Sequence, residues 1–343
     1  MLDNCGQPVY GKNMDYQHTP GYVIVNKRGV AKTSIPVYIE PGANNISWTS
    51  QFGSVTFHML AREWPQDGIN EAGLFISTLG AEGNASDEYP KIDSRPPLSQ
   101  FQMVQYQLDN FSTVDEVIAS FKSIRLARPP QNSVNPMAQH WLVGDSQGNC
   151  ASVEFLKGKM VLHRGKTMPA KALANSSYNH SIAYFRWYRF LKLFSPIPIP
   201  ESDRPSLIRF TVAADMVKKY RPQSLGPAVD YAFQILRNVE VTPAHHTAIW
   251  AIVYDSATKQ ILFRSWNSDQ VRWFDLSALD FSCTTPVKVM DITTDLSGDV
   301  SNSLIDYTKE IDLEMLNSWG ALGMPQAAID YMASYPDTTV CTE

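Results

Sequence analysis

Apolar and polar positions alternate in short segments near the start of the chain, which predicts β-strands there. These segments are rich in β-branched and aromatic residues and are bounded by turn-forming residues. They are Val9–Tyr10, Tyr22–Val25, Ser54–His58 and Gly73–Leu79. Two later groups of segments are separated only by short turns, so each group is predicted to be an antiparallel meander. The first comprises His140–Gly144, Cys150–Leu156 and Met160–His163, and the second Ala248–Tyr254, Gln260–Trp266 and Gln270–Asp275.

Between these strands, apolar residues recur at the spacing of amphipathic helices. Leu98, Phe101, Val104 and Leu108 predict one helix. Thr113–Glu116 has the form of a capping box, and it precedes an apolar series that extends to Ile124. Further helices are predicted over Ser206–Lys219 and Pro227–Asn238 and in the tail after Ser303, whereas the proline-rich segment Ser195–Pro205 is predicted to be irregular.

Strands, helices, strands and helices follow one another in that order, which indicates an α+β layered architecture with mostly antiparallel sheets. The connections are short and no linker divides the chain, so we expect a single domain over residues 1–343. Hydrophobic residues make up 44% of the chain and charged residues 18%, a balance typical of a globular protein with a substantial core.

Charge and hydropathy exclude several classes of partner. The net charge is -5 and no basic cluster is present, which argues against nucleic acid. No apolar run is long enough for a membrane helix, so membrane insertion is not expected. His245 and His246 have no carboxylate at a helical offset, so we interpret them as structural histidines and expect neither a metal nor a cofactor.

The four cysteines match no zinc-binding pattern. Cys150 lies in a strand-like segment and is interpreted as a buried free thiol. A bridge between Cys283 and Cys341 requires an oxidising compartment. The spacing alone does not decide whether this bridge forms.

The first segment of the chain, Asp3–Asp15, consists of a turn followed by a strand. In an antiparallel hairpin, the partners of Lys12 and Asp15 would lie a few residues before Met1. We therefore expect that half of this hairpin belongs to residues upstream of Met1. The alternative is that Val9–Asp15 is an edge strand paired elsewhere in the chain.

Several motifs, in the same order along nearly the whole chain, resemble those of the choloylglycine hydrolases and penicillin V acylases. Gly11–Tyr16, Gly-Lys-Asn-Met-Asp-Tyr, resembles the Gly-Arg-Asn-Met/Leu-Asp-Trp/Tyr segment of that family. The other similar segments are Trp48–Val55, Asp67–Leu74, His140–Asp145 with Val153–Phe155, Leu173–Ser176 and Ser206–Phe210. The resemblance implies an N-terminal-nucleophile (Ntn) hydrolase, a four-layer αββα sandwich that hydrolyses linear amides.

In that family the mature chain begins with a cysteine whose thiol attacks the amide carbon while its own α-amino group carries the proton. The unperturbed pKa of such an amine, about 7.7–8.0, suits this task. Cys5 is rejected as this nucleophile because it lies at the turn, about ten residues and so roughly 30 Å from Asp15. We expect the nucleophile upstream of Met1, so that the chain given by this sequence is N-terminally truncated.

By motif position, the resemblance assigns roles to Asp15, Asn175 and Arg209. Asp15 would orient the thiol and the amine, although an isolated aspartate here would be interpreted as a turn or cap residue. Asn175 would donate its side-chain amide to the oxyanion, together with a backbone N–H at the end of the Gly73–Leu79 strand. Arg209 would lower the pKa of the thiol and stabilise the tetrahedral intermediate, whereas a lone helical arginine is usually a surface group.

Two positions depart from the family pattern. Lys12 replaces the usual arginine, which keeps the charge but loses the planar five-donor fork. Gly80, followed by Ala81 in the expected oxyanion and substrate pocket, stands where bile-salt hydrolases carry asparagine and penicillin acylases often tyrosine. Both departures put bile salts and penicillin V in doubt as substrates.

The resemblance implies hydrolysis of a small-molecule N-acyl amide, such as a conjugated bile acid, penicillin V or an acyl-homoserine lactone. Relatives form homo-oligomers, tetramers among them, and are often exported through a signal peptide. If no signal peptide precedes the chain, a cytoplasmic location is expected. The alternatives are an inactive homologue that binds acyl ligands, and an α+β enzyme of another class. The aromatic run Tyr184–Tyr188 with Phe190 and Phe194 either lines an acyl pocket or forms one buried helical face.

Overall fold

Two large β-sheets form the centre of the molecule. The computed structural model describes residues 1–16, 20–34, 44–127, 137–194, 205–222, 227–240, 247–320 and 323–343. The first sheet has the strand order β1 (Leu2–Asn4), β2 (Gln7–Tyr16), β14 (Thr247–Asp255), β15 (Gln260–Ser265), β16 (Ser268–Asp275) and β18 (Gly298–Asp299). The second has the order β13 (Lys159–Arg164), β12 (Cys150–Leu156), β11 (Met137–Gly144), β8 (Phe75–Asn84), β7 (Asp67–Asn70), β6 (Ser54–His58), β3 (Tyr22–Asn26), β17 (Lys288–Asp291) and β19 (Ile305–Asp306).

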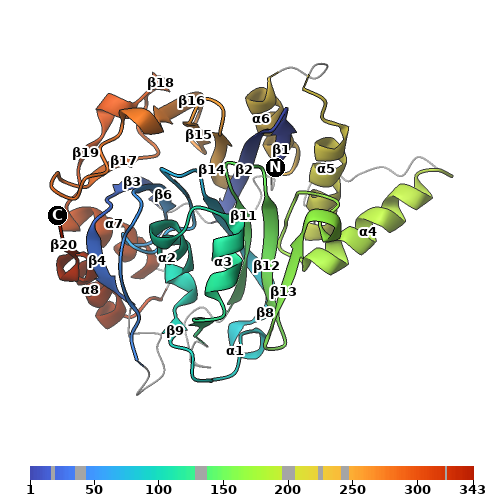
Figure 1. Cartoon of the computed structure of the whole chain (residues 1–343). Helices are drawn as coiled ribbons and strands as arrows, with labels where there is room; N and C mark the ends of the chain where they lie inside the picture. Colours follow the sequence, from blue (N-terminus) through green and yellow to red (C-terminus); the bar gives the residue numbers. More distant parts are fainter. Residues whose placement is uncertain are drawn as a thin grey trace.

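Two small sheets and the helices complete the fold (Figure 1). The small sheets are β20 (Val340–Cys341), β4 (Val30–Thr33) and β5 (Ser47–Thr49), and the parallel pair β9 (Pro97–Leu98) and β10 (Arg125–Leu126). The helices are α1 (Ala85–Glu88), α2 (Met103–Asn110), α3 (Val114–Ser120), α4 (Tyr178–Leu191), α5 (Ser206–Lys219), α6 (Ala228–Asn238), α7 (Lys309–Gly320) and α8 (Gln326–Ser334).

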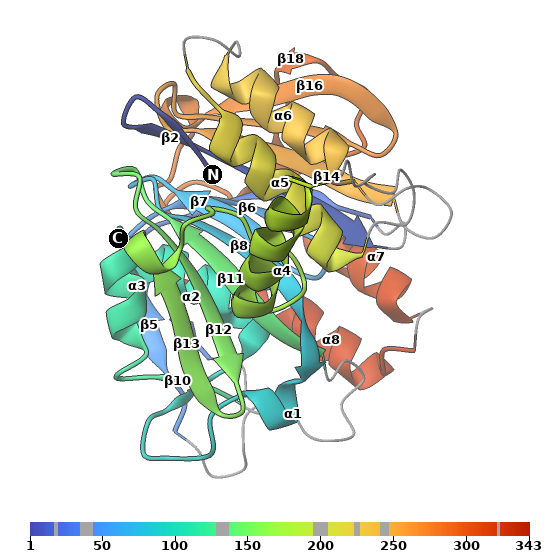
Figure 2. The same ribbon diagram turned by 90° about the vertical axis from the view of Figure 1, so that its right-hand side faces the viewer.

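The sheets and helices stack in four layers (Figure 2). Between the sheets lies an aromatic and aliphatic core, in which Tyr10 of β2 stacks on Phe75 of β8 with ring centroids 4.9 Å apart. Helix α6 packs on the outer face of the first sheet through residues such as Leu236, and α2 and α3 pack on the second through residues such as Leu108 and Val117. The predicted αββα sandwich is therefore confirmed.

Both predicted meanders are confirmed. Strands β11, β12 and β13 pair antiparallel in sequence order, as do β14, β15 and β16. The capping box at the start of α3 is also present, since the Thr113 side chain accepts from the Glu116 N–H and the Glu116 carboxylate accepts from the Thr113 N–H.

Three predicted helices differ from the structure. Leu98 belongs to the short strand β9, where it pairs with Leu126, and α2 begins only at Met103 after a 3-10 turn. Helix α3 ends at Ser120, before Ile124. The tail after Ser303 contains α7 and α8 but also strands β19 and β20. Leu98 and Ile124 still face the core without continuing a helix, whereas Ile305 of β19 and Val340 of β20 are exposed. Backbone pairing with distant segments sets the local conformation in β9, β19 and β20.

Some predictions fall on parts of the chain that are not described. His245 and His246 lie outside the described residues, as do residues 195–204 of the proline-rich connection. Among the helices that the structure does describe, none combines the length and apolar character required to cross a bilayer.

Candidate active site

Most residues singled out by the sequence motifs meet where β2 lies over β8, but Ala81 packs against the core beneath α2 and α3. Strand β2 brings Lys12 and Asp15, and its full-length pairing with β14 holds it in place. Gly80 and Ala81 lie on β8, Asn175 precedes α4, and Arg209 lies near the start of α5. Elements that are far apart in the sequence thus converge on one location, which no periodicity predicts.

Asp15, Arg209 and Asn175 form a continuous polar chain. The Arg209 Nη1 atom lies 3.4 Å from the Asp15 carboxylate, and Nη2 donates to Asn175 Oδ1 at 2.6 Å. The Asn175 Nδ2 atom in turn donates to the Gly80 carbonyl at 2.8 Å. Because a guanidinium only donates, this contact fixes which end of the Asn175 amide faces Gly80. Within the described chain, the second N–H of Nδ2 has no acceptor.

Lys12 reaches from the first sheet to the second. Its ammonium donates to the Thr78 carbonyl of β8 at 2.8 Å. Burial lowers the pKa of Lys12, while the charges of Asp67 and Asp15 act in the opposite direction. An arginine fork would offer several parallel N–H bonds at this position, whereas the lysine donates, within the described chain, to the Thr78 carbonyl alone.

Asp67 is a buried carboxylate near the site to which the sequence assigned no role. Its oxygens accept from Ser77 Oγ at 2.7 Å and from Trp250 Nε1 at 3.3 Å. Burial raises the pKa of Asp67, and the charge of Lys12 opposes that rise. The sequence signal was its place as the first residue of the motif Asp67–Leu74. A motif does not reveal that the charge of this carboxylate acts on the Lys12 ammonium.

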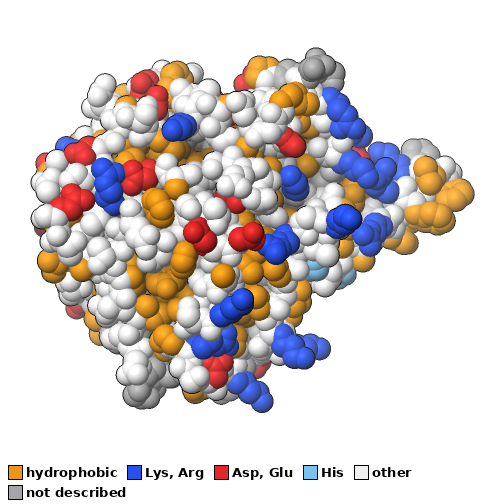
Figure 3. All heavy atoms as spheres, viewed as in Figure 1, with side chains coloured by type: hydrophobic (Ala, Val, Ile, Leu, Met, Phe, Trp, Pro, Cys, Tyr) orange, Lys and Arg blue, Asp and Glu red, His pale blue; other side chains and the backbone are white. Residues whose placement is uncertain are grey.

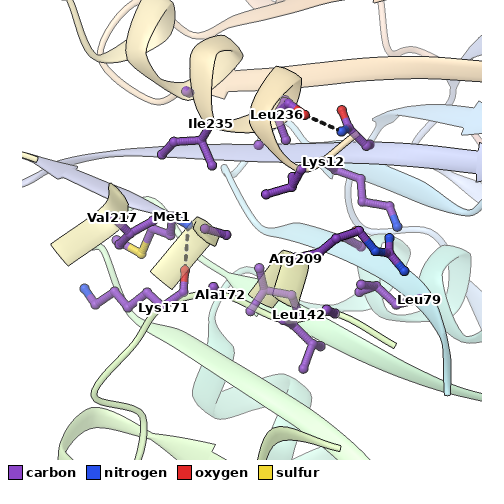
Figure 4. Close-up of a pocket in the computed structure, with 18 of the residues that line it drawn as sticks. Met1, Lys12, Leu79, Leu142, Lys171, Ala172, Arg209, Val217, Ile235 and Leu236 are labelled. Carbon is purple, nitrogen blue, oxygen red and sulfur yellow. Dashed lines mark hydrogen bonds between the residues drawn. The ribbon is translucent and has the colours of Figure 1, made fainter. Parts of the chain in front are cut away.

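A cavity of about 110 Å³ adjoins this polar chain (Figure 4). Lys12, Asp15 and Arg209 line one side of it. The rest of the lining is mostly apolar and comes from β8, β11, the segment before Asn175, α5 and α6, including Leu79, Leu142, Leu173, Val217 and Ile235. Its size is below the roughly 300–1,000 Å³ of a typical small-molecule pocket.

The aromatic run on α4 does not line this cavity. Phe185 and Tyr188 are buried in or against the core, whereas Trp187, Phe190 and Phe194 are among the most exposed large apolar side chains. Neither sequence interpretation of the run was right, because successive residues of a helix point in different directions and the run is divided between two faces.

All four cysteines lie in the described chain, at a turn, in the core and in a disulfide. Cys5 is exposed at the β1–β2 turn, with the left-handed φ of 55° that such a turn requires. Cys150 is buried, and burial raises the pKa of its thiol. Cys283 and Cys341 form a disulfide, which answers the question that the sequence left open.

Within the described part of the chain, no group of three or more histidine, cysteine, aspartate or glutamate side chains is arranged to hold a metal ion. The described residues of the site offer a carboxylate, two cations, an amide and backbone N–H groups. Such a set can hold a nucleophile and stabilise a developing oxyanion.

Comparison with known proteins gives one family. The model of the linear amide C–N hydrolases, choloylglycine hydrolase family, matches residues 1–289. The chain is similar to the penicillin V acylase of Pectobacterium atrosepticum, with 28% identity over 273 residues that cover 70% of each chain. It is also similar to a bile salt hydrolase/transferase of Bifidobacterium longum subsp. longum, with 24% identity over 47% of this chain and 50% of that protein.

Solved structures with a similar fold come from the same group. The penicillin V acylase from Agrobacterium tumefaciens superposes with a TM-score of 0.73 and 27% identity, over 90% of this chain and 96% of that one. A variant of the conjugated bile acid hydrolase from Clostridium perfringens gives a TM-score of 0.70 with 19% identity, over 87% and 97% of the two chains, a likeness of fold alone.

Proposed function

The chain belongs to the linear amide C–N hydrolases of the choloylglycine hydrolase family, and we propose that it hydrolyses the amide bond of small N-acyl compounds with an N-terminal cysteine as nucleophile. The observation that carries this proposal is the chain of contacts from Asp15 through Arg209 and Asn175 to Gly80. These are the positions at which the family's motifs place the catalytic machinery.

We propose that the nucleophile pairs with Asp15 across the β-ladder. In the β1–β2 hairpin, Leu2 pairs with Val9 and Asn4 with Gln7. Continuing this register backwards places the partner of Asp15 a few residues before Met1. A thiol there would lie beside the Asp15 carboxylate and the Arg209 guanidinium, whose positive charge favours the thiolate.

The chemistry follows the usual course of covalent amide hydrolysis. The sulfur bonds to the carbonyl carbon, and the thiol proton passes through the α-amino group to the leaving nitrogen as the C–N bond breaks. Water then cleaves the thioester and releases the acid. The second N–H of Asn175 Nδ2 and the backbone N–H of Gly80 would bind the oxyanion.

We propose a substrate outside the penicillins and bile salts. A Cβ built on Gly80 would lie 2.7 Å from Met137 Sδ and 3.6 Å from Asn175 Nδ2, so the Met137 thioether already occupies the space that a side chain of residue 80 would need. Gly80 therefore offers no side chain to recognise a substrate next to the amide donor, and the apolar Met137 thioether lies there instead. N-acyl amino acids and acyl-homoserine lactones are the candidates that follow.

The test is hydrolysis by the full gene product, with residues upstream of Met1 processed to a free N-terminal cysteine. Penicillin V, glycocholate and N-acyl-homoserine lactones of several chain lengths form the panel. Asn175→Ala should lower kcat/KM by about 10²- to 10³-fold, the usual effect of removing an oxyanion donor. The matched control is Asn179→Ala, an exposed asparagine on α4 that should leave the rate unchanged.

The second candidate is an inactive homologue that binds acyl ligands. The observation that favours it is the position of Cys5, Cys150, Cys283 and Cys341, which lie at a turn, in the core and in a disulfide. A full gene product without turnover on the panel, but with saturable binding of an acyl-homoserine lactone by calorimetry, would support this candidate over the hydrolase.

A further inference from the structure

The end of α4 presents an unusual concentration of exposed apolar side chains. Trp187 is 53% exposed, Phe190 59%, Leu193 79% and Phe194 74%. They recur every three or four residues and therefore follow one side of the helix and its extension. Phe190 and Phe194 pack against each other with ring centroids 5.1 Å apart. Patches of this kind usually mark an interaction surface.

This patch lies on a projection of the molecule. Helix α4 extends away from the two sheets, and its far end stands clear of the body (Figure 1). In the space-filling view the apolar side chains gather at the tip of that projection, with lysine and arginine side chains beside them (Figure 3). The opposite stripe of the helix, which includes Ile182, Phe185 and Tyr188, is buried and anchors α4 to the body.

All charged side chains of α4 near the apolar patch are positive. Arg186, Arg189 and Lys192 are exposed, and α4 itself contains no acidic residue. The Arg189 guanidinium lies over the Phe185 ring at 5.7 Å and the Lys192 ammonium over the Tyr188 ring at 5.9 Å, so both charged groups lie about one helical turn back from the apolar tip. On the neighbouring α5, Asp215 pairs with Lys219 at 2.7 Å.

We propose that the tip of α4 docks the protein onto an anionic lipid bilayer. Tryptophan and phenylalanine beside arginine and lysine are the composition of helices that lie in the membrane interface. The cations would meet lipid phosphates while the rings enter the boundary of the acyl chains. With 14 residues, α4 is shorter than the roughly 20 that a spanning helix needs, so it attaches without crossing.

A second copy of the chain fits this surface less well. A two-fold contact brings the same patch of both subunits together. Here it would place Arg186, Arg189 and Lys192 against their own counterparts, with no acidic residue on α4 to offset them. An anionic bilayer, by contrast, offers phosphates to the cations and an apolar interior to the aromatic rings of the same helix.

Docking at the tip of α4 would hold the protein on the bilayer, with the candidate active site at the opposite end of that helix. Helix α4 packs along α5, which contributes Arg209 and Val217 to the cavity. Docking would thus hold the protein at the surface into which acyl compounds partition. This would increase the local concentration of ligand both for a hydrolase and for an inactive acyl-binding homologue.

The test is co-sedimentation of the full chain with vesicles of phosphatidylcholine alone and with added phosphatidylglycerol. Anionic vesicles should bind at least about tenfold more tightly, and high salt should weaken that binding. Phe190→Ser with Phe194→Ser should lower the affinity by about tenfold or more. Replacing Arg186, Arg189 and Lys192 with glutamine should lower it by roughly fivefold per cation.

The controls are Ile305→Ser and Lys122→Gln, an exposed apolar and an exposed basic residue on other elements, which should bind like the wild type. Thermal melting of each variant separates loss of binding from loss of folding. Equal binding to both vesicle types, or an unchanged affinity in the α4 variants, would overturn the proposal. So would sedimentation velocity in which the aromatic variant converts a dimer to a monomer while no form binds vesicles.

Discussion

At the scale of single residues, the sequence predicted which side chains belong to the candidate site but not which of them contact each other. The motifs selected Asp15, Asn175 and Arg209 correctly as residues that come together, although their catalytic roles stay predictions. The sequence could not show that Arg209 connects the other two, because that depends on α5 and β2 meeting. Nor could it show that Lys12 makes its contact across the sheets to Thr78.

Buried carboxylates were the residues that sequence reasoning missed most. Asp312 on α7 is fully buried, where its oxygens accept from the Arg62 N–H at 2.8 Å and from the Tyr307 hydroxyl at 2.6 Å. Burial raises the pKa of Asp312 to about 6. An acidic residue in a polar-looking helix gives no sequence signal of such burial.

This raised pKa predicts how stability depends on pH. Because the folded protein holds the Asp312 proton more tightly than the unfolded chain, this residue contributes most below about pH 4 and the contribution is lost as pH rises through 6. The difference in free energy of unfolding between wild type and Asp312→Asn should therefore shift by about 2 kcal/mol between pH 4 and 7. Urea unfolding at both pH values measures it.

The control for that experiment is Asp330→Asn, on the exposed side of α8. This substitution measures the effect of removing a carboxylate from an exposed position. A difference for Asp312→Asn that is also the same at both pH values would mean that the carboxyl is not held protonated by burial.

At the scale of elements, the sequence was most reliable where pairing is local. Strands β6 and β12 and helix α5 have the predicted bounds, because hairpin turns and amphipathic stripes are encoded within a few residues. The short strands β9 and β20 were missed, since their partners β10 and β4 lie far away in the sequence and the segments themselves have only two residues each.

The C-terminal element is fixed by a disulfide as well as by pairing. Cys341 pairs with Val30 in β4 and is bonded to Cys283, 58 residues away in sequence. A bond that closes a loop of this length is worth about 4 kcal/mol by restricting the unfolded chain. The double variant Cys283→Ser, Cys341→Ser should lose about that much free energy of unfolding in urea.

The exposed free thiol provides the comparison for the disulfide. Cys5→Ser should leave the unfolding midpoint unchanged. If a reducing agent leaves the stability of the wild type intact, Cys283 and Cys341 are not bonded in solution.

At the scale of the whole molecule, the layered fold was predictable in class but not in topology. The alternation of strands and helices indicated an α+β sandwich, and the motif order implied its four layers. Strand β2 pairs with β14, so that Asp15 is paired with Ala248. The sequence could not predict this pairing, because it depends on how the whole core between the two sheets packs. That the whole chain forms one domain stays a prediction.

The central claim is that a thiol opposite Asp15 carries the acyl group. It is tested most directly by trapping the full gene product with a slowly hydrolysed N-acyl substrate, quenching in acid and mapping the thioester by peptide mass spectrometry. The proposal predicts the acyl mass on an N-terminal cysteine upstream of Met1, and more of it when Asn175 is intact than in Asn175→Ala. An acyl mass on Cys5 or Cys150, or none on any cysteine while the substrate is consumed, would contradict it.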